Sequence, residues 1–360
     1  MNQNIQSLLD AGQRLWLNNI TRELLVSGQL AHYISTLSIT GLTSNPTIFE
    51  RAIAGSEQYD ETIALLAARG LIGEALFFEL ALQDLSEAAA LFYPVFLDTD
   101  GVDGWVSIEV SPLLADDAAA SVGAAAQLCA RAHCPNLFIK IPGTRAGLLA
   151  IEQSIVDGVP VNVTLLFSCA QWQAAAEAYL RALERRLVLG LDLRVASVAS
   201  LFISRWDVAV AAKTAPVLRN RLGITMAKRC YRAHRELIDS ARWRRLAAAG
   251  ARPQRLLWAS TGTKDPSARD TLYVESLAAR DTIDTIPEQT LLAYADHGIA
   301  GAALSADGGD GEAEIALFER AGIAIELLAA QLQREGVQVF ANSWGALLSA
   351  LEKKSRITSR

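Results

Sequence analysis

One lysine lies within an apolar segment, NLFIKIPGT, where it could do covalent chemistry. Successive side chains of a strand point to opposite faces, so Lys140 shares a face with Phe138, whereas Ile139 and Ile141 take the other. If the isoleucines face helices, Lys140 points into the interior of a barrel. Burial disfavours the ammonium form and makes a neutral, nucleophilic amine accessible near neutral pH. Such an amine attacks a carbonyl group to form a Schiff base, which is an electron sink for cleaving a neighbouring C–C bond.

Two further apolar segments carry polar side chains with the same alternation. In WVSIEVSP, Glu109 shares a face with Ser107, and in PVNVTLLFS, Asn162 shares a face with Thr164. Each segment therefore directs polar groups to the same interior near its carboxyl end. We expect Glu109 and Thr164 to hold a water molecule that serves the lysine as an acid–base relay.

Two later segments are suited to binding a phosphate group. SLFISRWD places Ser200 and Arg205 after one apolar segment, and ASTGTKDP places hydroxyls, a glycine and Lys264 after the next. Loops at the carboxyl ends of late barrel strands often bind phosphate, and arginine binds it through two parallel hydrogen bonds. We expect Arg205 and Lys264 to contact a phosphorylated ligand.

The elements that position these side chains alternate along the chain. Short apolar runs rich in Val, Ile, Leu and Phe are each followed by a longer Ala-rich segment with helical spacing, such as 115–133 and 169–187. Eight strands alternating with helices predict a parallel sheet that closes into a (β/α)8 TIM barrel, and no Gly-rich turn favours a doubly wound nucleotide-binding fold. The predicted strands are 15–20, 38–44, 105–110, 136–141, 160–167, 195–203, 255–261 and 281–286.

Two parts exceed a minimal barrel. Residues 50–100 predict a helical insertion between the second and third strands, and residues 310–352 predict two terminal helices, 312–336 and 340–354, that pack across the barrel. No Pro/Ser-rich linker, low-complexity tract or internal repeat marks a domain boundary. Residues 1–360 are therefore expected to form one domain.

Composition excludes several classes of protein. The 33 basic and 39 acidic residues give a net charge of −6, without the basic runs typical of nucleic-acid binding. The start MNQNIQSLLD does not resemble a signal peptide, and no uncharged apolar stretch of about 18 residues predicts a membrane span, which favours a soluble cytoplasmic protein. No metal site is expected either, since the cysteines lack CxxC spacing or a nearby histidine and fit free thiols: Cys129, Cys134, Cys169 and Cys230.

Seven motifs in order make the chain resemble the transaldolases, specifically their longer bacterial form. Any one of these motifs is weak, but together they cover essentially the whole chain. They are GLTSNPTIF (41–49), DGVDGWVSIEVSP (100–112), NLFIKIPGT (136–144), VNVTLLFS (161–168), SLFISRWD (200–207), LLWASTGTKDP (256–266) and YVESLAARDTIDTIPEQTL (273–291).

The resemblance implies a barrel that is circularly permuted relative to other Schiff-base aldolases. It implies transfer of a dihydroxyacetone unit from fructose 6-phosphate or sedoheptulose 7-phosphate to an aldose phosphate, erythrose 4-phosphate or glyceraldehyde 3-phosphate, in the pentose phosphate pathway. No cofactor is implied beyond the covalent Schiff base.

The resemblance also implies a role for each matching residue. Lys140 matches the Schiff-base lysine, and Glu109 and Thr164 match the pair that holds the catalytic water. The remaining matches are expected to bind the dihydroxyacetone hydroxyls, the sugar and the phosphate: Asn45, Asn162, Ser200, Arg205, Ser260 and, with a looser alignment, Lys264.

One position departs from the family pattern. In similar proteins the first strand usually ends in an aspartate that accepts the proton of the C4 hydroxyl, whereas LWLNNI has Asn18 at this place. An amide can orient that hydroxyl but cannot act as its base, so the expected enzyme is slow while still forming the imine. An introduced substitution, a natural variant with altered chemistry and a family member that tolerates the amide all fit. Asn19, of opposite parity, is expected to have a structural role.

Two alternative functions remain open at the level of sequence. A fructose-6-phosphate-aldolase-like enzyme would use the same imine but release free dihydroxyacetone. A sugar-phosphate binder of low turnover would keep the barrel and lose catalysis through Asn18. The phosphorylated sugars are the expected partners, and the chain is expected to be a monomer or a homodimer.

Overall fold

Eight parallel strands close into a barrel in chain order, and β8 pairs with β1. The computed structural model describes residues 2–358. The predicted (β/α)8 barrel is confirmed, although the first two strands are shorter than predicted. The strands are β1 (Arg14–Leu17), β2 (Gly41–Thr43), β3 (Trp105–Glu109), β4 (Leu137–Pro142), β5 (Val161–Leu166), β6 (Ser197–Phe202), β7 (Arg255–Ala259) and β8 (Thr282–Ile286).

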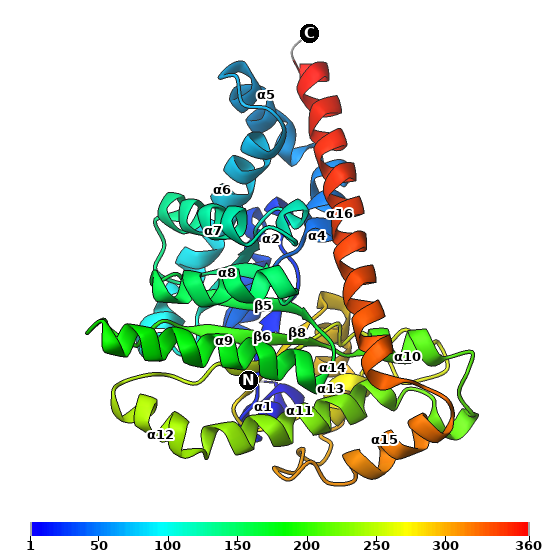
Figure 1. Cartoon of the computed structure of the whole chain (residues 1–360). Helices are drawn as coiled ribbons and strands as arrows, with labels where there is room; N and C mark the ends of the chain where they lie inside the picture. Colours follow the sequence, from blue (N-terminus) through cyan, green and yellow to red (C-terminus); the bar gives the residue numbers. More distant parts are fainter. Residues whose placement is uncertain (1, 359–360) are drawn as a thin grey trace.

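Every strand is followed by at least one helix, and Figure 1 shows α7, α8 and α9 side by side across the barrel. The helices are α1 (Gln3–Asp10), α2 (Arg22–Val26), α3 (Gln29–Leu37), α4 (Pro46–Gly55), α5 (Asp60–Ala68), α6 (Gly73–Asp98), α7 (Ala118–Ala132), α8 (Arg145–Val156), α9 (Cys169–Val188), α10 (Ser204–Val210), α11 (Leu222–Ile238), α12 (Ala241–Ala248), α13 (Leu272–Ser276), α14 (Glu288–His297), α15 (Gly311–Arg320) and α16 (Ile325–Thr358). Three short 3₁₀ helices are η1 (Glu57–Tyr59), η2 (Pro112–Leu114) and η3 (Pro216–Leu218).

Alternation along the strands sorts side chains between the barrel interior and the helices. On β4, Ile139 and Ile141 belong to the core that the strands share with the helices. Phe138 belongs instead to a separate inner cluster with Trp16 and Trp105, and this cluster fills the amino-terminal half of the barrel. Lys140 has the parity of Phe138 and lies nearer the carboxyl end, so it enters the barrel above the aromatic side chains, as predicted.

A glycine makes room for the largest of these interior side chains. Gly41 on β2 pairs with Trp16 on β1, and a Cβ atom at Gly41 would lie 2.6 Å from the Trp16 ring. Any larger residue at this position would displace the indole. The short strand β2 thus begins with glycine because the neighbouring indole occupies the space of its side chain.

The segment between β2 and β3 is helical and consists of α4, α5 and α6 with η1 between them. Of the described helices, α6 alone is long and apolar enough to cross a membrane by length and composition. It contacts β3, α5 and α16, and its buried Asp84 accepts hydrogen bonds from Arg22 of α2 at 2.8 Å and from the Tyr59 hydroxyl at 2.8 Å. These contacts make α6 a core helix of the inserted segment.

The terminal helices divide at a different place from the one predicted. The sequence pattern predicts a break between residues 336 and 340, whereas α16 runs unbroken through Gly336 and the break lies before Ile325, at Gly322 with φ +85°. Gly336 is tolerated inside the helix because it packs against Leu165, whose side chain would lie 2.9 Å from a Cβ atom there. Figure 1 shows α16 rising from α15 past the barrel to α4 and α5.

Candidate active site

A cavity of about 330 Å³ opens at the carboxyl ends of the strands. Glu109 and Asn162, two of the ten predicted site residues, lie just outside its wall and contact the lining residues Lys140 and Ser200. The structure therefore brings all ten predicted residues together. The eight that line the cavity are Asn18, Asn45, Lys140, Thr164, Ser200, Arg205, Ser260 and Lys264.

Lys140 and Glu109 form a buried ion pair on adjacent strands. The Lys140 Nζ lies 3.0 Å from Glu109 Oε1, and both side chains are less than a tenth exposed. Nζ also donates a hydrogen bond of 2.9 Å to the carbonyl of Ser44, after β2. Burial raises the pKa of the Glu109 carboxyl above its usual value, and the Lys140 ammonium only partly opposes this. The raised pKa makes the protonated carboxyl, a possible proton donor, easier to reach.

A small cavity of about 10 Å³ lies between Glu109, Lys140 and Thr164. In the described chain neither carboxylate oxygen of Glu109 has a well-directed hydrogen bond, and the Thr164 Oγ1 has no partner. A water molecule needs a cavity of about 10–15 Å³ and two to four polar neighbours. The volume of the cavity matches the size of one water molecule. The oxygens of Glu109 and Thr164 that lack a well-directed hydrogen bond can serve as its hydrogen-bonding partners.

Asn162 lies on the floor of the site in a chain of hydrogen bonds across three strands. Its Nδ2 donates to Ser107 Oγ at 3.2 Å, and its Oδ1 accepts from Ser200 Oγ at 2.7 Å. Asn162 pairs in register with Lys140 on the adjacent strand and is fully buried. The Asn162 amide thus links β3, β5 and β6 beneath the Lys140 side chain, and its partner Ser200 lines the cavity.

Two threonines orient the amide of Asn18. Thr43 Oγ1 donates to Asn18 Oδ1 at 3.2 Å, and the hydroxyl of Thr285 lies 2.5 Å from that of Thr43. Because Thr43 gives its proton to Asn18, Thr285 must donate to Thr43. The Oδ1 atom is occupied, and the Nδ2 donor is the part of the amide that remains for a ligand. Neither threonine was identified from the sequence, although each has the parity of an interior residue.

Helix α4 contributes an arginine that sequence reasoning missed. Asn45 caps α4 by accepting a 3.0 Å hydrogen bond from Ile48 N through Oδ1, which leaves its Nδ2 for the cavity. Thr47 and Arg51, four residues apart on the same helix, both line the cavity. The i,i+4 spacing behind a capping asparagine was the available signal for Arg51.

The outer part of the cavity is cationic. Arg51, Arg205 and Lys264 line it from three different elements, and no lining residue in the described chain is acidic. Burial lowers the pKa of Lys264, and the positive charges of Arg205 and Arg51 lower it further. Such mutual repulsion is relieved by a doubly charged anion. The arrangement therefore fits a phosphate group, as expected for Arg205 and Lys264.

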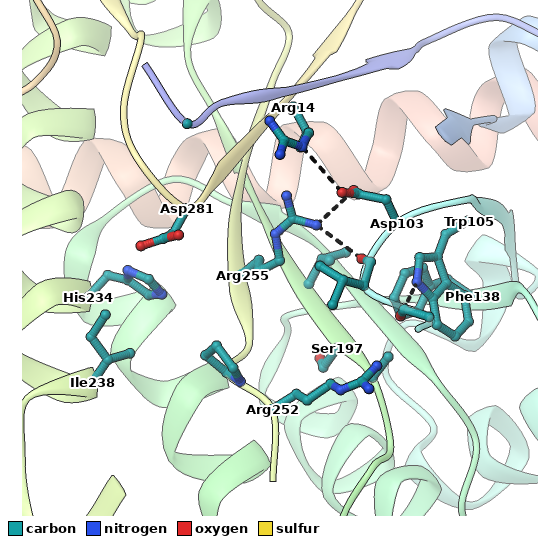
Figure 2. A pocket seen from close by; sticks show the side chains of 16 residues that line it. Arg14, Asp103, Trp105, Phe138, Ser197, His234, Ile238, Arg252, Arg255 and Asp281 are labelled. Carbon is teal, nitrogen blue, oxygen red and sulfur yellow. Dashed lines mark hydrogen bonds and ion pairs between the residues drawn. The ribbon is translucent and has the colours of Figure 1, made fainter. Parts of the chain in front are cut away.

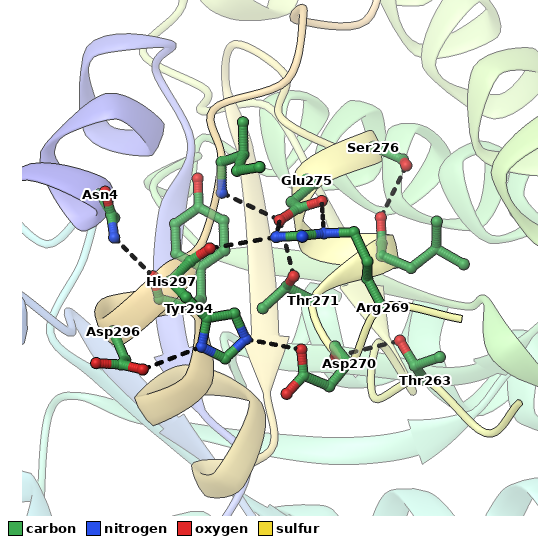
Figure 3. A network of polar contacts seen from close by, with 12 residues as sticks. Asn4, Thr263, Arg269, Asp270, Thr271, Glu275, Ser276, Tyr294, Asp296 and His297 are labelled. Atoms are coloured by element: carbon green, nitrogen blue, oxygen red, sulfur yellow. Dashed lines mark hydrogen bonds and ion pairs between the residues drawn. The ribbon is translucent and has the colours of Figure 1, made fainter. Parts of the chain in front are cut away.

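The loop that carries Lys264 is anchored to α14 by polar contacts (Figure 3). Thr263 Oγ1 donates to the carbonyl of Asp270 at 3.1 Å. The His297 ring lies between two carboxylates, 2.9 Å from Asp270 and 3.1 Å from Asp296, and hydrogen bonds to these carboxylates raise its pKa. These contacts fix the carboxyl-terminal part of the loop, at Asp270, to the end of α14, and so hold Lys264 at the cavity.

Ser260, the first residue of this loop, has φ +59°, a conformation that costs a non-glycine residue energy. Its Oγ lies 2.9 Å from Ser204 Oγ, and its carbonyl accepts from Ser204 N at 3.1 Å. Strained backbone of this kind persists only where the surroundings hold it, and it gathers at functional sites. Ser204 thus keeps Ser260 on the cavity wall.

Helix α16 braces the strands that carry Lys140 and Thr164. Gln333 Nε2 donates to the carbonyls of Gly143 and Leu165, each at 3.0 Å. Leu165 directly follows Thr164 and has φ +59°. One side chain from the end of the sequence thus ties the ends of β4 and β5 together and holds a strained residue next to the predicted water site. Gln333 was missed by the sequence analysis because nothing local marks it.

Replacing Gln333 with leucine is expected to lower kcat about tenfold and to lower the melting temperature. The substitution leaves two partly buried carbonyls unpaired, at about 1–3 kcal/mol each, and frees the backbone beside Thr164. Steady-state kinetics and thermal unfolding measure both effects. Gln338→Leu on an exposed part of α16 is the matched control. Equal kinetics for the two variants would show that Gln333 has no part in positioning the site.

Comparison with known proteins gives results in line with this geometry. Residues 15–351 match the family described as Transaldolase/Fructose-6-phosphate aldolase. A transaldolase of Parafrankia sp. is 41% identical over 364 residues, and one of Saccharopolyspora erythraea is 42% identical over 360 residues; each alignment covers 98% of both chains. A transaldolase of Thiobacillus denitrificans is 43% identical, with 94% of this chain and 97% of the relative covered.

Proposed function

The chain belongs to the transaldolase/fructose-6-phosphate aldolase family and is a transaldolase, and from this premise we propose that it acts through a Schiff base on Lys140. The proposed donors are fructose 6-phosphate and sedoheptulose 7-phosphate, and the proposed acceptors are erythrose 4-phosphate and glyceraldehyde 3-phosphate. This reaction belongs to the non-oxidative pentose phosphate pathway of the cytoplasm and needs no cofactor. The observation that carries the proposal is the buried Lys140–Glu109 pair beside a cavity of the size of one water.

Formation of the imine uses the lysine and the water site. The neutral Nζ of Lys140 attacks C2 of the ketose, and the resulting carbinolamine must lose its hydroxyl as water. A water between Glu109 and Thr164 delivers the proton to that hydroxyl, with Glu109 as the ultimate donor. The raised pKa of Glu109 supports this role because a protonated carboxyl is needed at the start of the step.

Cleavage uses the iminium group as an electron sink. The C3–C4 bond breaks, its electron pair moves into the iminium to form an enamine, and the proton of the C4 hydroxyl passes to solvent water in the cavity. Asn18 can hold the hydroxyl oxygen through Nδ2 but accepts no proton. The departing aldose phosphate is replaced by the acceptor, whose aldehyde carbon is attacked by C3 of the enamine, and hydrolysis of the new imine frees Lys140.

The test of the proposal is covalent trapping. Borohydride reduction in the presence of fructose 6-phosphate should leave a three-carbon adduct on Lys140, detected by peptide mass spectrometry. An unmodified Lys140 after reduction with substrate would contradict the Schiff-base mechanism. Release of product only when erythrose 4-phosphate is present would separate a transaldolase from an aldolase that frees dihydroxyacetone.

Substitution of the cationic residues should affect binding of the phosphorylated sugar. Arg205→Gln is expected to raise KM for fructose 6-phosphate about 10- to 100-fold, since a hydrogen bond between charged groups contributes about 1.5–3 kcal/mol. Arg51→Gln should act in the same direction. Steady-state kinetics with fructose 6-phosphate and with unphosphorylated fructose provide the measurement, and the exposed Arg69→Gln is the control. A similar loss with both sugars would rule out a phosphate contact.

A further inference from the structure

A second cavity, of about 340 Å³, lies at the opposite end of the barrel from Lys140. Its lining includes Trp105 and Ser197, the first residues of β3 and β6, and Arg14 and Arg255, the first residues of β1 and β7. It is therefore built from the amino ends of strands whose carboxyl ends form the catalytic cavity. Its volume is within the range of small-molecule sites.

Flat apolar side chains form one wall of this cavity (Figure 2). The rings of Trp105 and Phe138 are stacked, with centroids 4.2 Å apart and an interplanar angle of 28°. Both rings are almost fully buried, with 5% of Trp105 and 1% of Phe138 exposed, and the indole nitrogen of Trp105 donates to the carbonyl of Gly101 at 3.0 Å. The accessible apolar surface of this wall therefore comes mainly from Pro253 and Ile238, which are less buried.

Arginines form the other wall. In Figure 2, Arg14 and Arg255 lie on either side of Asp103, with ion-pair distances of 3.5 and 2.9 Å, and Arg252 lies apart from them. Arg252 pairs outside the cavity with Asp100, which is largely exposed. Two guanidinium groups of the cavity wall thus flank one buried carboxylate, and the third lies apart from them.

The charged side chains of the cavity wall are positive in sum. The remaining lining carboxylate, Asp281, is paired with Arg235 at 2.9 Å and Arg280 at 3.7 Å, outside the lining. The five charged lining residues, which are three arginines and two aspartates, carry a net charge of +1. The whole chain, in contrast, carries −6. His234, also in the lining, adds no charge, since burial lowers its pKa to about 4.

Donors remain available on the arginine wall. Among the described residues, the hydrogen bonds of Arg255 involve only its Nη1, which donates to Asp103 Oδ1 at 2.9 Å and to the carbonyl of Val102 at 3.1 Å. Arg14 contacts Asp103 through Nε and the carbonyl of Gln13 through Nη1. Each guanidinium therefore keeps an Nη2 group for a ligand, in the planar geometry that suits phosphate.

We propose that this cavity is a second binding site, distinct from the catalytic one, for a small phosphate monoester with an apolar group. The apolar group packs against Pro253 and Ile238, and the phosphate is held by the Nη2 groups of Arg14 and Arg255. Arg252, whose Nη groups donate to Asp100, adds positive charge to the cavity wall. The proposal rests on the volume, apolar lining and charge of this cavity and does not depend on the reaction at Lys140.

The test uses phenyl phosphate as the probe, with calorimetric titration and thermal unfolding of the full chain. We expect saturable binding and a rise in melting temperature, with inorganic phosphate at least tenfold weaker because it lacks the ring. Arg252→Gln should weaken binding of phenyl phosphate about threefold, since it removes one positive charge from the cavity wall. This variant is expected to fold, since the lost partner Asp100 is exposed. Ala196→Phe, which fills the cavity without removing a charge, should abolish binding.

Two controls separate this cavity from other sites. Arg205→Gln, at the catalytic cavity, and Arg69→Gln, on the exposed surface, should leave the affinity for phenyl phosphate unchanged. Loss of binding in Arg205→Gln would place the probe in the catalytic cavity and overturn the proposal. Unchanged binding in Arg252→Gln and Ala196→Phe, equal affinity for inorganic phosphate, or no saturation by about 10 mM would overturn it as well.

Discussion

Replacing Asn18 with aspartate is expected to raise kcat about 10²- to 10⁴-fold, the range that a positioned general base contributes. The side chain lines the catalytic cavity at the end of β1, and the amide now present can only donate its remaining N–H groups to the C4 hydroxyl. A carboxylate of the same shape would accept the proton that this hydroxyl loses during C3–C4 cleavage. Steady-state rates with fructose 6-phosphate and erythrose 4-phosphate measure the change.

The surroundings of Asn18 are already suited to a carboxylate. Thr43 donates to Oδ1, and Thr285 donates to Thr43, so an aspartate would keep this hydrogen bond and expose its second oxygen where Nδ2 now lies. KM should therefore change much less than kcat. In addition, kcat of the variant should fall at acidic pH as the new carboxylate becomes protonated. The pH–rate profile of the parent chain should lack this decrease.

The control is Asn18→Ala, which removes the amide without adding a base and should give no increase. If aspartate and alanine have the same effect, the proton is accepted elsewhere and Asn18 is not the cause of slow turnover. If Asn18→Asp shows no activity while Lys140→Ala still binds fructose 6-phosphate, the chain acts as a sugar-phosphate binder instead. The comparison thus decides between the functions that the sequence left open.

Strand parity explains why so much of the site could be predicted from the sequence. Alternation is a local property, and it assigns Lys140 and Glu109 to the interior as soon as their apolar neighbours are assigned to the helices. Closure of the barrel then brings residues such as Asn18 and Lys140 to the same cavity, although 122 positions separate them. The distances and hydrogen-bond partners required the structure.

Two of the residues that were missed come from helices. Arg51 and Gln333 reach the site only because α4 and α16 pack over the barrel in one particular orientation, and no local pattern specifies that orientation. The wrong prediction of a helix break after Gly336 also arose because a tertiary contact is not visible in the local sequence. Glycine lowers helix stability by about 1 kcal/mol, but contact between Gly336 and Leu165 outweighs this propensity.

Replacing Lys140 with methionine should reduce kcat by a factor on the order of 10⁴ or more and abolish borohydride trapping, since Lys140 is the amine that pairs with Glu109 in the described part of the chain. Methionine keeps the length of the side chain and removes its charge. A variant that retained trapping would show that another lysine forms the imine.

The same substitution should make stability depend on pH in a predictable direction. Lys140 lowers the pKa of the buried Glu109, and without it desolvation raises this pKa further. A carboxyl whose folded pKa exceeds its unfolded value of about 4.3 favours the folded state below that value and loses this contribution as pH rises through the folded pKa. Lys140→Met should therefore lose stability as pH rises above about 4.3 towards the raised folded pKa of Glu109, by up to about 1.4 kcal/mol per pH unit.

Adding Glu109→Gln to Lys140→Met should remove this slope, because the buried group no longer ionises. The double variant should recover much of the lost stability near pH 8 while staying inactive, as neutral replacement of both partners of a buried ion pair is often neutral or stabilising by about 1–4 kcal/mol. Thermal unfolding of the three proteins from pH 5 to pH 8 tests this. A slope that persists in the double variant would mean that a group other than Glu109 titrates, and a double variant much less stable than the parent near pH 8 would mean that the pair stabilises the fold. The expected pattern would instead show that the pair is retained for its chemistry.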